Sequence, residues 1–178
     1  MIHSLPAVPP FYQGYLQQSE GLSLTAALHR SLEVLNNKLE EQLVAIGDEV
    51  YAPGKWTVPV ILQHLIDVER VMSYRAMSFA RKETTPLPGF DEDTYAATTL
   101  QQQRTVATLL EELKLVRVSN IYMFDSFDDE ALSREGIANN VPLSVAALGY
   151  VIAGHQMHHL HIIEERYLPL AKGIISPF

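Results

Sequence analysis

Histidine is concentrated near the end of the chain, where four of the seven histidines fall within seven residues. These four are His155, His158, His159 and His161. Cysteine is absent, so a metal bound by this chain would be held by imidazole nitrogens and carboxylate oxygens. His155 and His159 are four residues apart, which places them one above the other on one face of a helix. Such a pair can supply two nitrogen ligands to one divalent ion.

The helical period places both of these histidines on the buried side of the helix that we predict over residues 144–169. Four apolar residues share this stripe at steps of three and four, namely Val145, Leu148, Ile152 and Ile162. The helix predicted over residues 58–81 carries a third core-facing histidine, His64. Three imidazoles from two neighbouring helices can form one face of a divalent ion, with the remaining positions open to water or substrate. We therefore predict a metal site made of His64, His155 and His159.

Buried histidines without a metal are the alternative explanation. A lone residue such as His64 is more often a core histidine with its hydrogen bonds satisfied. Two core-facing imidazoles one turn apart, however, need two separate partners in an apolar interior, whereas one ion satisfies both. His158 and His161 fall on either side of the stripe, so we expect them at the bundle edge or in solvent. Gln156 stands where a zincin protease carries its glutamate, which argues against that mechanism.

Two carboxylates and a glycine lie close to these histidines in sequence. Neither Asp67 nor Glu69 shares the face of His64 well enough to be a fourth ligand, so we expect one of them to hydrogen-bond a ligating histidine or another helix. A solvated position is the alternative. Gly154 costs about 1 kcal/mol relative to alanine inside a helix, which a close backbone approach beside the metal would explain. Residues 89–91 are expected at the pocket rim or in a capping turn.

Three polar residues are expected on the inward sides of two helices, where polar groups are costly unless paired. They are Arg75, Arg117 and Asn120. These side chains could bind an anionic or polar substrate. For Arg75 we expect a structural role instead, as the partner of a carboxylate such as Glu111 or Asp91.

Apolar periodicity predicts four long helices, over about residues 22–46, 58–81, 98–127 and 144–169. No convincing strand or fixed repeat accompanies them, so the predicted fold class is all-α, a four-helix bundle. Residues 82–97 form a long irregular connection between helices two and three, and residues 136–142 form another connection with room for a small hairpin or turn. Residues 1–21 are predicted as an extended N-terminal arm and residues 170–178 as a C-terminal tail that packs back on the bundle.

Composition limits the partners that this chain can have. With 178 residues, of which 47% are hydrophobic, the chain fits a single domain over residues 1–178 with a sizeable core. The net charge of −8 and the scattered lysines and arginines disfavour direct nucleic-acid binding. No run of roughly 18 apolar residues is present and the first residues lack a basic, then apolar, signal pattern. We expect a cytoplasmic protein that does not bind membranes.

Three stretches of the sequence closely resemble the DinB-like superfamily: residues 55–70 with His64, residues 87–93, and residues 153–159 with the H-x-x-x-H pattern. The similarity extends from about residue 10 to residue 167. The resemblance implies a four-helix bundle, frequently a homodimer, with His64, His155 and His159 as ligands of a nickel- or zinc-type ion. The superfamily includes proteins described as metal-dependent hydrolases and as thiol-dependent transferases, so the resemblance does not imply one reaction.

Three functions follow from these patterns. The first is an enzyme in which the metal lowers the pKa of a water for hydrolysis, or of a low-molecular-weight thiol cosubstrate for transfer to a small molecule. His158, Glu69 or a metal-bound hydroxide could serve as its general base. The second is a non-catalytic metal- or ligand-binding bundle related to stress. The third is a purely structural bundle in which the histidines are buried without a metal.

Overall fold

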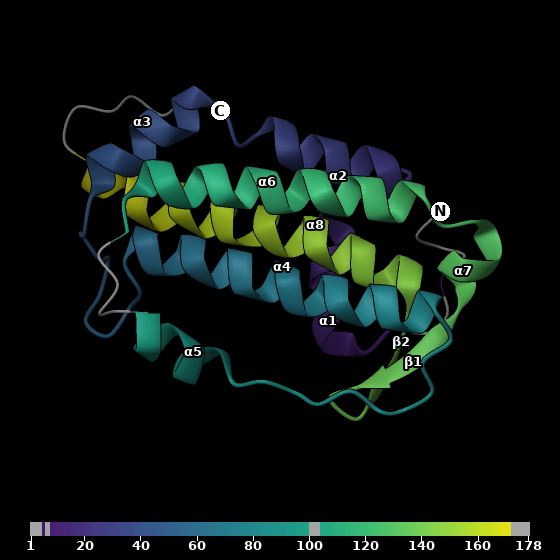
Figure 1. The fold of residues 1–178 in the computed structure, drawn as a ribbon. Helices are drawn as coiled ribbons and strands as arrows, with labels where there is room; N and C mark the ends of the chain where they lie inside the picture. Colours follow the sequence, from purple (N-terminus) through teal and green to yellow (C-terminus); the bar gives the residue numbers. More distant parts are fainter. Residues whose placement is uncertain (1–4, 6–7, 100–103, 172–178) are drawn as a thin grey trace.

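The chain folds as an all-α four-helix bundle, as predicted (Figure 1). The computed structural model describes residue 5 and residues 8–99 and 104–171. Helix α4, Val58–Ala80, packs against α6, Val106–Asp125, and α8, Val145–Ile162. Helix α2, Leu24–Glu33, contacts α6 and α8 and completes the bundle. None of the described helices is long and apolar enough to cross a membrane.

Figure 1 shows α4 and α6 running in the same direction, while α2 and α8 run in the opposite one. A long crossover is therefore needed to join α4 to α6. The chain returns along α4 from residue 81 to α5, Glu92–Thr99. On the way Leu87 forms two backbone hydrogen bonds with the hairpin, to Ile137 and Asn139. The predicted connection is therefore present, although its second half is helical and α6 begins at residue 106 rather than 98.

The helix predicted over residues 22–46 is two helices, α2 and α3, the latter spanning Asn37–Ile46. The side chain of Asn36 accepts a hydrogen bond of 3.1 Å from the backbone N–H of Leu39 and so caps α3. This cap allows a new helix to start there in a different direction. The prediction of one continuous helix is wrong at this point.

The prediction of an extended arm over residues 1–21 is also wrong, since residues Pro10–Gln17 form helix α1. Pro10 occupies the first helical position, where its fixed φ angle and missing N–H cost nothing. Tyr12 and Leu16, four residues apart, are buried, and α1 packs against α8. Residues 1–4 and 6–7 of the predicted arm lie outside the described residues.

A small hairpin precedes α8, as the sequence allowed. After the short helix α7, Asp129–Ser133, strands β1, Glu135–Ala138, and β2, Val141–Ser144, pair antiparallel. Asn139 and Asn140 connect them with φ angles of 50° and 62°, as a two-residue type I′ hairpin turn requires. Ser144 then caps α8 through the backbone N–H of Ala147.

The last predicted helix, over residues 144–169, is not α-helical throughout. Helix α8 ends at Ile162 and continues as a π-helical turn, Ile163–Tyr167, and a 3₁₀ turn, Leu168–Leu170. Ala171 is buried against this end of the bundle. Residues 172–178, the greater part of the tail predicted to pack on the bundle, lie outside the described residues.

The core consists of two apolar clusters separated by a buried polar layer. One cluster is built largely from the first half of α8 and the second half of α4, together with α1, α2, the second half of α6 and the hairpin. The other is built from α3, the first halves of α4 and α6, and the π-helical turn. Each of the four bundle helices carries buried polar residues where the clusters meet. They are Ser31 in α2, Glu69 in α4, Arg117 and Asn120 in α6, and His155 and Gln156 in α8.

Candidate metal centre

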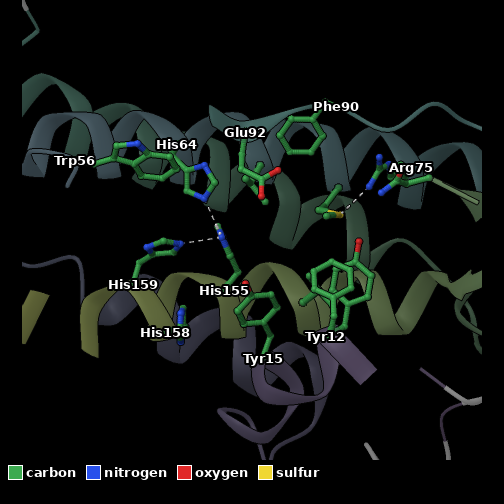
Figure 2. A pocket seen from close by; sticks show the side chains of 15 residues that line it. Tyr12, Tyr15, Trp56, His64, Arg75, Phe90, Glu92, His155, His158 and His159 are labelled. Carbon is green, nitrogen blue, oxygen red and sulfur yellow. Dashed lines mark hydrogen bonds between the residues drawn. The ribbon is translucent and has the colours of Figure 1, made fainter. Parts of the chain in front are cut away.

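The structure brings together the three histidines that the sequence singled out, one from α4 and two from α8 (Figure 2). The Nε2 atom of His155 lies 3.1 Å from the Nε2 atom of His64 and 3.1 Å from that of His159. One potential ligand atom from each ring lies within 4.8 Å of the other two. His64 and His155 are buried, with exposed fractions of 8% and 6%, and His159 is partly exposed.

Hydrogen bonding alone does not account for this arrangement. The Nε2 atom of a neutral imidazole carries either one hydrogen or one lone pair. The Nε2 atom of His155 can therefore form a hydrogen bond with one of its two neighbours at 3.1 Å, but not with both. Three lone pairs directed at one ion would have nitrogens about 3.3 Å apart, given zinc–nitrogen bonds of 2.0–2.1 Å in a tetrahedral site. The donor set and its spacing fit a divalent ion.

The electrostatics of the group also suit metal ligation. Burial lowers the pKa of His64 to about 4, although the negative charge of Asp93 opposes this change. Burial, reinforced by His64 and His158, lowers the pKa of His159 to about 3. Burial and the neighbouring imidazoles hold the pKa of His155 well below its usual range. All three rings are therefore neutral at pH 7, which is the form that binds a metal.

Aromatic rings and a close backbone approach hold the imidazoles in place. The ring of Trp56 lies 4.9 Å from that of His64, and the ring of Tyr15 lies 5.2 Å from that of His155 in an edge-on arrangement. A Cβ atom at Gly154 would lie 1.9 Å from the carbonyl oxygen of Tyr15, so only glycine lets α1 pack this closely on α8. The expectation of a close backbone approach beside the histidines is confirmed.

A cavity of about 270 Å³ opens beside the three histidines (Figure 2). Its walls come from α1, α4 and the segment just before it, α5, α8, the crossover and the hairpin turn. The lining residues are Phe11, Tyr12, Tyr15, Trp56, His64, Val68, Met72, Arg75, Phe90, Glu92, Asn139, Val151, His155, His158 and His159. Phe90 confirms the expectation that the crossover forms the pocket rim. Asp91 instead caps α5 by accepting a hydrogen bond from the backbone N–H of Thr94.

Glu69 belongs to the polar layer behind the histidines rather than to the cavity. Its carboxylate accepts hydrogen bonds of 2.7 and 2.9 Å from Arg117 and one of 3.0 Å from Asn120. Arg117, which is fully buried, also donates to the hydroxyl of Ser31. Glu69 thus joins α4 to α6, one of the roles expected for it, and is unavailable as a base. Asp67 accepts a hydrogen bond from Gln63 at the edge of the bundle.

Arg75 does not pair with Glu111 or Asp91, and that expectation is wrong. It is 2% exposed, donates a 2.9 Å hydrogen bond to the carbonyl oxygen of Pro88, and approaches the sulfur of Met72 at 3.5 Å. No carboxylate of the described residues forms an ion pair with it. The inward direction of the side chain was predictable, but the crossover holds Asp91 in its own capping turn, which leaves the guanidinium on the cavity wall.

The remaining histidines and the missed residues complete the site. Neither His158 nor His161 belongs to the three-histidine group. His161 is exposed, while His158 lines the cavity with its ring 5.4 Å from that of Tyr15. Sequence reasoning missed Tyr12, Tyr15 and Glu92, because they lie on the short helices α1 and α5. The i, i+4 pair of Tyr12 and Leu16 after two prolines was the available signal.

The fold and site together define an all-α bundle whose two central helices bring three neutral imidazoles to the wall of one cavity. The sequence profile of the DinB superfamily matches residues 23–163, and the chain belongs to this superfamily. No curated protein matches it by sequence. YfiT from Bacillus subtilis shares the fold, with a TM-score of 0.63 and 19% identity over 92% of this chain and 90% of YfiT. YfiT is described as a probable metal-dependent hydrolase with an unusual four-helix bundle topology.

Proposed function

We propose that this protein is a metal-dependent hydrolase that binds one divalent ion, zinc or nickel, through His64, His155 and His159. The observation that carries the proposal is the convergence of three Nε2 atoms at the wall of a cavity large enough for a small molecule. Imidazole nitrogens without cysteine suit zinc and nickel better than magnesium or calcium. The description of YfiT, a protein of the same fold, as a probable metal-dependent hydrolase supports the same reaction class.

A three-histidine site leaves part of the coordination sphere for a reactant. Among the described residues no fourth histidine or carboxylate joins the group. When bound, a divalent ion in such a site acts as a Lewis acid and lowers the pKa of the nucleophile, here water. The cavity beside the imidazoles gives the substrate access to this open side, which favours a catalytic role over a closed, structural one.

Glu92 is the group that we assign as proton acceptor. Glu92, the first residue of α5, lines the cavity, and in Figure 2 its side chain lies between His64 and Phe90. Its carboxylate oxygens can take a proton from the attacking nucleophile and return it to the leaving group. His158 lines the cavity as well, but its ring packs against those of Tyr15 and His159 and serves to position them.

Metal analysis tests the first half of the proposal. Protein purified without an affinity tag and supplied with zinc or nickel should hold about one ion per chain. His155→Ala and His159→Ala should abolish binding, whereas His161→Ala, on the exposed side of the same helix, should not. Less than about 0.1 ion per wild-type chain after reloading would refute a metal site in this fold.

A hydrolysis screen tests the second half. Metal-loaded protein is assayed against esters and amides, with a parallel series of electrophiles plus a low-molecular-weight thiol. We expect ester or amide cleavage that is lost in His64→Ala and falls at least about 100-fold in Glu92→Gln, the loss typical of a missing general base. Activity that survives in His64→Ala would show that the reaction occurs elsewhere. Turnover only in the thiol series would replace hydrolysis by transfer at the same site.

A further inference from the structure

Arg75 presents a buried positive charge on the wall of the candidate active site. Its guanidinium is part of the lining of the same cavity as the three histidines, at the far end in Figure 2. The side chain is anchored rather than free, because one N–H group donates to the Pro88 carbonyl oxygen and the ring of Phe90 lies 6.0 Å from the guanidinium carbon. The charge is therefore held in a fixed place on the wall of the cavity.

Among the described residues no carboxylate forms an ion pair with this charge. The ion pairs among the described residues involve Arg70, Arg104, Arg117, Arg134 and Lys82, but not Arg75. The undescribed residues contain no aspartate or glutamate, so they cannot supply a side-chain partner. Glu92 lines the same cavity but forms no ion pair with Arg75. Arg117 is also buried, but unlike Arg75 it forms an ion pair, with the carboxylate of Glu69.

An unpaired buried charge destabilises a folded protein, so a buried guanidinium without a carboxylate partner is a candidate site for an anionic ligand. Arginine has five N–H donors, arranged so that two can bind both oxygens of one carboxylate or phosphate. The described hydrogen bonds of Arg75 use one N–H for Pro88 and a second for the Met72 sulfur. A third N–H is shared with Tyr12, whose hydroxyl oxygen accepts from the guanidinium and whose own hydrogen can be donated to the same anion.

We propose that Arg75 binds the anionic group of the substrate, and that the substrate is a small organic acid with its reacting group at the three-histidine end of the cavity. Arg75 lies eleven positions after His64 along α4, a rise of about 16 Å. The cavity wall between them is apolar and includes Val68, Met72 and Val151. The anion and the reacting group are therefore separated by an apolar spacer of several carbon atoms.

The position of the reacting group rests on the proposed function, whereas the anion site does not depend on the metal. Binding of octanoate, with 1-octanol as its neutral counterpart, tests the anion site. The fluorescence of Trp56, the only tryptophan in the chain, reports on binding because its ring lines the cavity. We expect wild-type protein, both metal-loaded and chelator-treated, to bind octanoate at least tenfold more tightly than 1-octanol.

Variants separate this role from a structural one. Arg75→Met should remove the tenfold preference and leave 1-octanol binding unchanged. The melting temperature of this variant should be equal to or higher than that of wild type. Arg75→Lys, which keeps the charge, should retain part of the preference. Arg70→Met on the exposed side of α4, where Arg70 pairs with Glu112, should keep it in full. A preference that persists in Arg75→Met, or that wild-type protein lacks, would overturn the proposal.

The metal ligands provide the remaining comparison. A preference for octanoate that depends on Arg75 and persists in His64→Ala supports the anion site, whatever the metal analysis shows. If that preference is found in a protein that binds no zinc or nickel, the proposed hydrolase function fails and the anion site stands. If metal and hydrolysis are both found but the preference is not, the anion site fails alone.

Discussion

The metal-free protein should lose stability between pH 7 and pH 4 because its histidines resist protonation in the folded state. His64 has an ordinary pKa of 6.5 in the unfolded chain, and burial lowers this pKa to about 4 in the folded protein. As the pH falls below 6.5 the unfolded chain takes up a proton that the folded chain excludes, so the equilibrium shifts toward unfolding. This contribution to stability is intact above pH 6.5 and is progressively lost as the pH falls toward 4.

The size of the effect follows from the two pKa values. For His64 alone the loss amounts to about 2 kcal/mol at pH 5 and about 3 kcal/mol at pH 4. The folded-state pKa of about 4 already contains the opposing effect of the Asp93 charge. The rings of Trp56, His155 and His159 pack around the His64 imidazole. The charge of a protonated His64 also lowers the pKa values of His155 and His159. Replacing His64 therefore lets these two residues take up protons more easily in the folded state, which further reduces the loss of stability at low pH.

Urea unfolding of chelator-treated protein, followed by circular dichroism at pH 7.5 and pH 5, measures this loss. The wild-type midpoint should fall by about 1 M more than the midpoint of His64→Gln, given a slope of about 2 kcal/mol per molar urea. His161→Gln, which changes an exposed histidine, should behave like wild type. Equal losses in wild type and His64→Gln would show that the buried imidazole is not neutral in the folded state.

Three further outcomes can be measured with the same denaturation assay. Gly154→Ala should cost about 1–3 kcal/mol by overpacking against the Tyr15 carbonyl. Gly14→Ala, at a position with open space around it, should not destabilise the protein. Equal effects of the two substitutions would contradict the close approach at Gly154. Glu69→Gln should cost about 3–5 kcal/mol, because it leaves Arg117 buried without its charge partner, and adding Arg117→Met should recover much of this loss. Zinc or nickel at 100 times its dissociation constant should add about 2.7 kcal/mol to the unfolding free energy, and a destabilising effect would contradict binding to the native state.

The long helices and the histidine group were predictable because both depend on a local period. Helix α4 begins at the predicted residue and ends one residue early, at Ala80. Within a helix of that length, the face on which His64 lies depends only on the spacing of apolar residues around it. The same reasoning placed His155 and His159 on the buried face of α8. Their meeting with His64 also required that two long apolar stripes pack together, which the bundle ensures.

The short helices could not be found in this way. Apolar steps of three and four continue through Leu32, Leu35 and Leu39, so the period itself conceals the break before α3; the cap at Asn36 was the only local sign. Helix α1 has eight residues, too few to be stable alone. It forms because Tyr12 and Leu16 are buried and because Gly154 admits its backbone. That contact joins residues far apart in sequence.

Arg75 illustrates a different limit. The period correctly predicted that its side chain faces inward, but a period carries no information about partners. The expected carboxylate, Asp91, caps α5, and Glu111 forms no ion pair with it among the described residues. The absence of a carboxylate partner among the described residues is what makes Arg75 informative about ligands.

The polar layer between the two apolar clusters fixes how the helices align along the bundle axis. Sliding α6 by one turn relative to α4 would displace Arg117 by about 5.4 Å from the carboxylate of Glu69 and into an apolar cluster. Apolar side chains alone tolerate such shifts, since one leucine replaces another. Because α8 joins the same layer through Gln156, which donates to the backbone of Ser31, its axial position is set as well. The registry that places three imidazole nitrogens within reach of one ion is thus encoded by residues that never touch that ion.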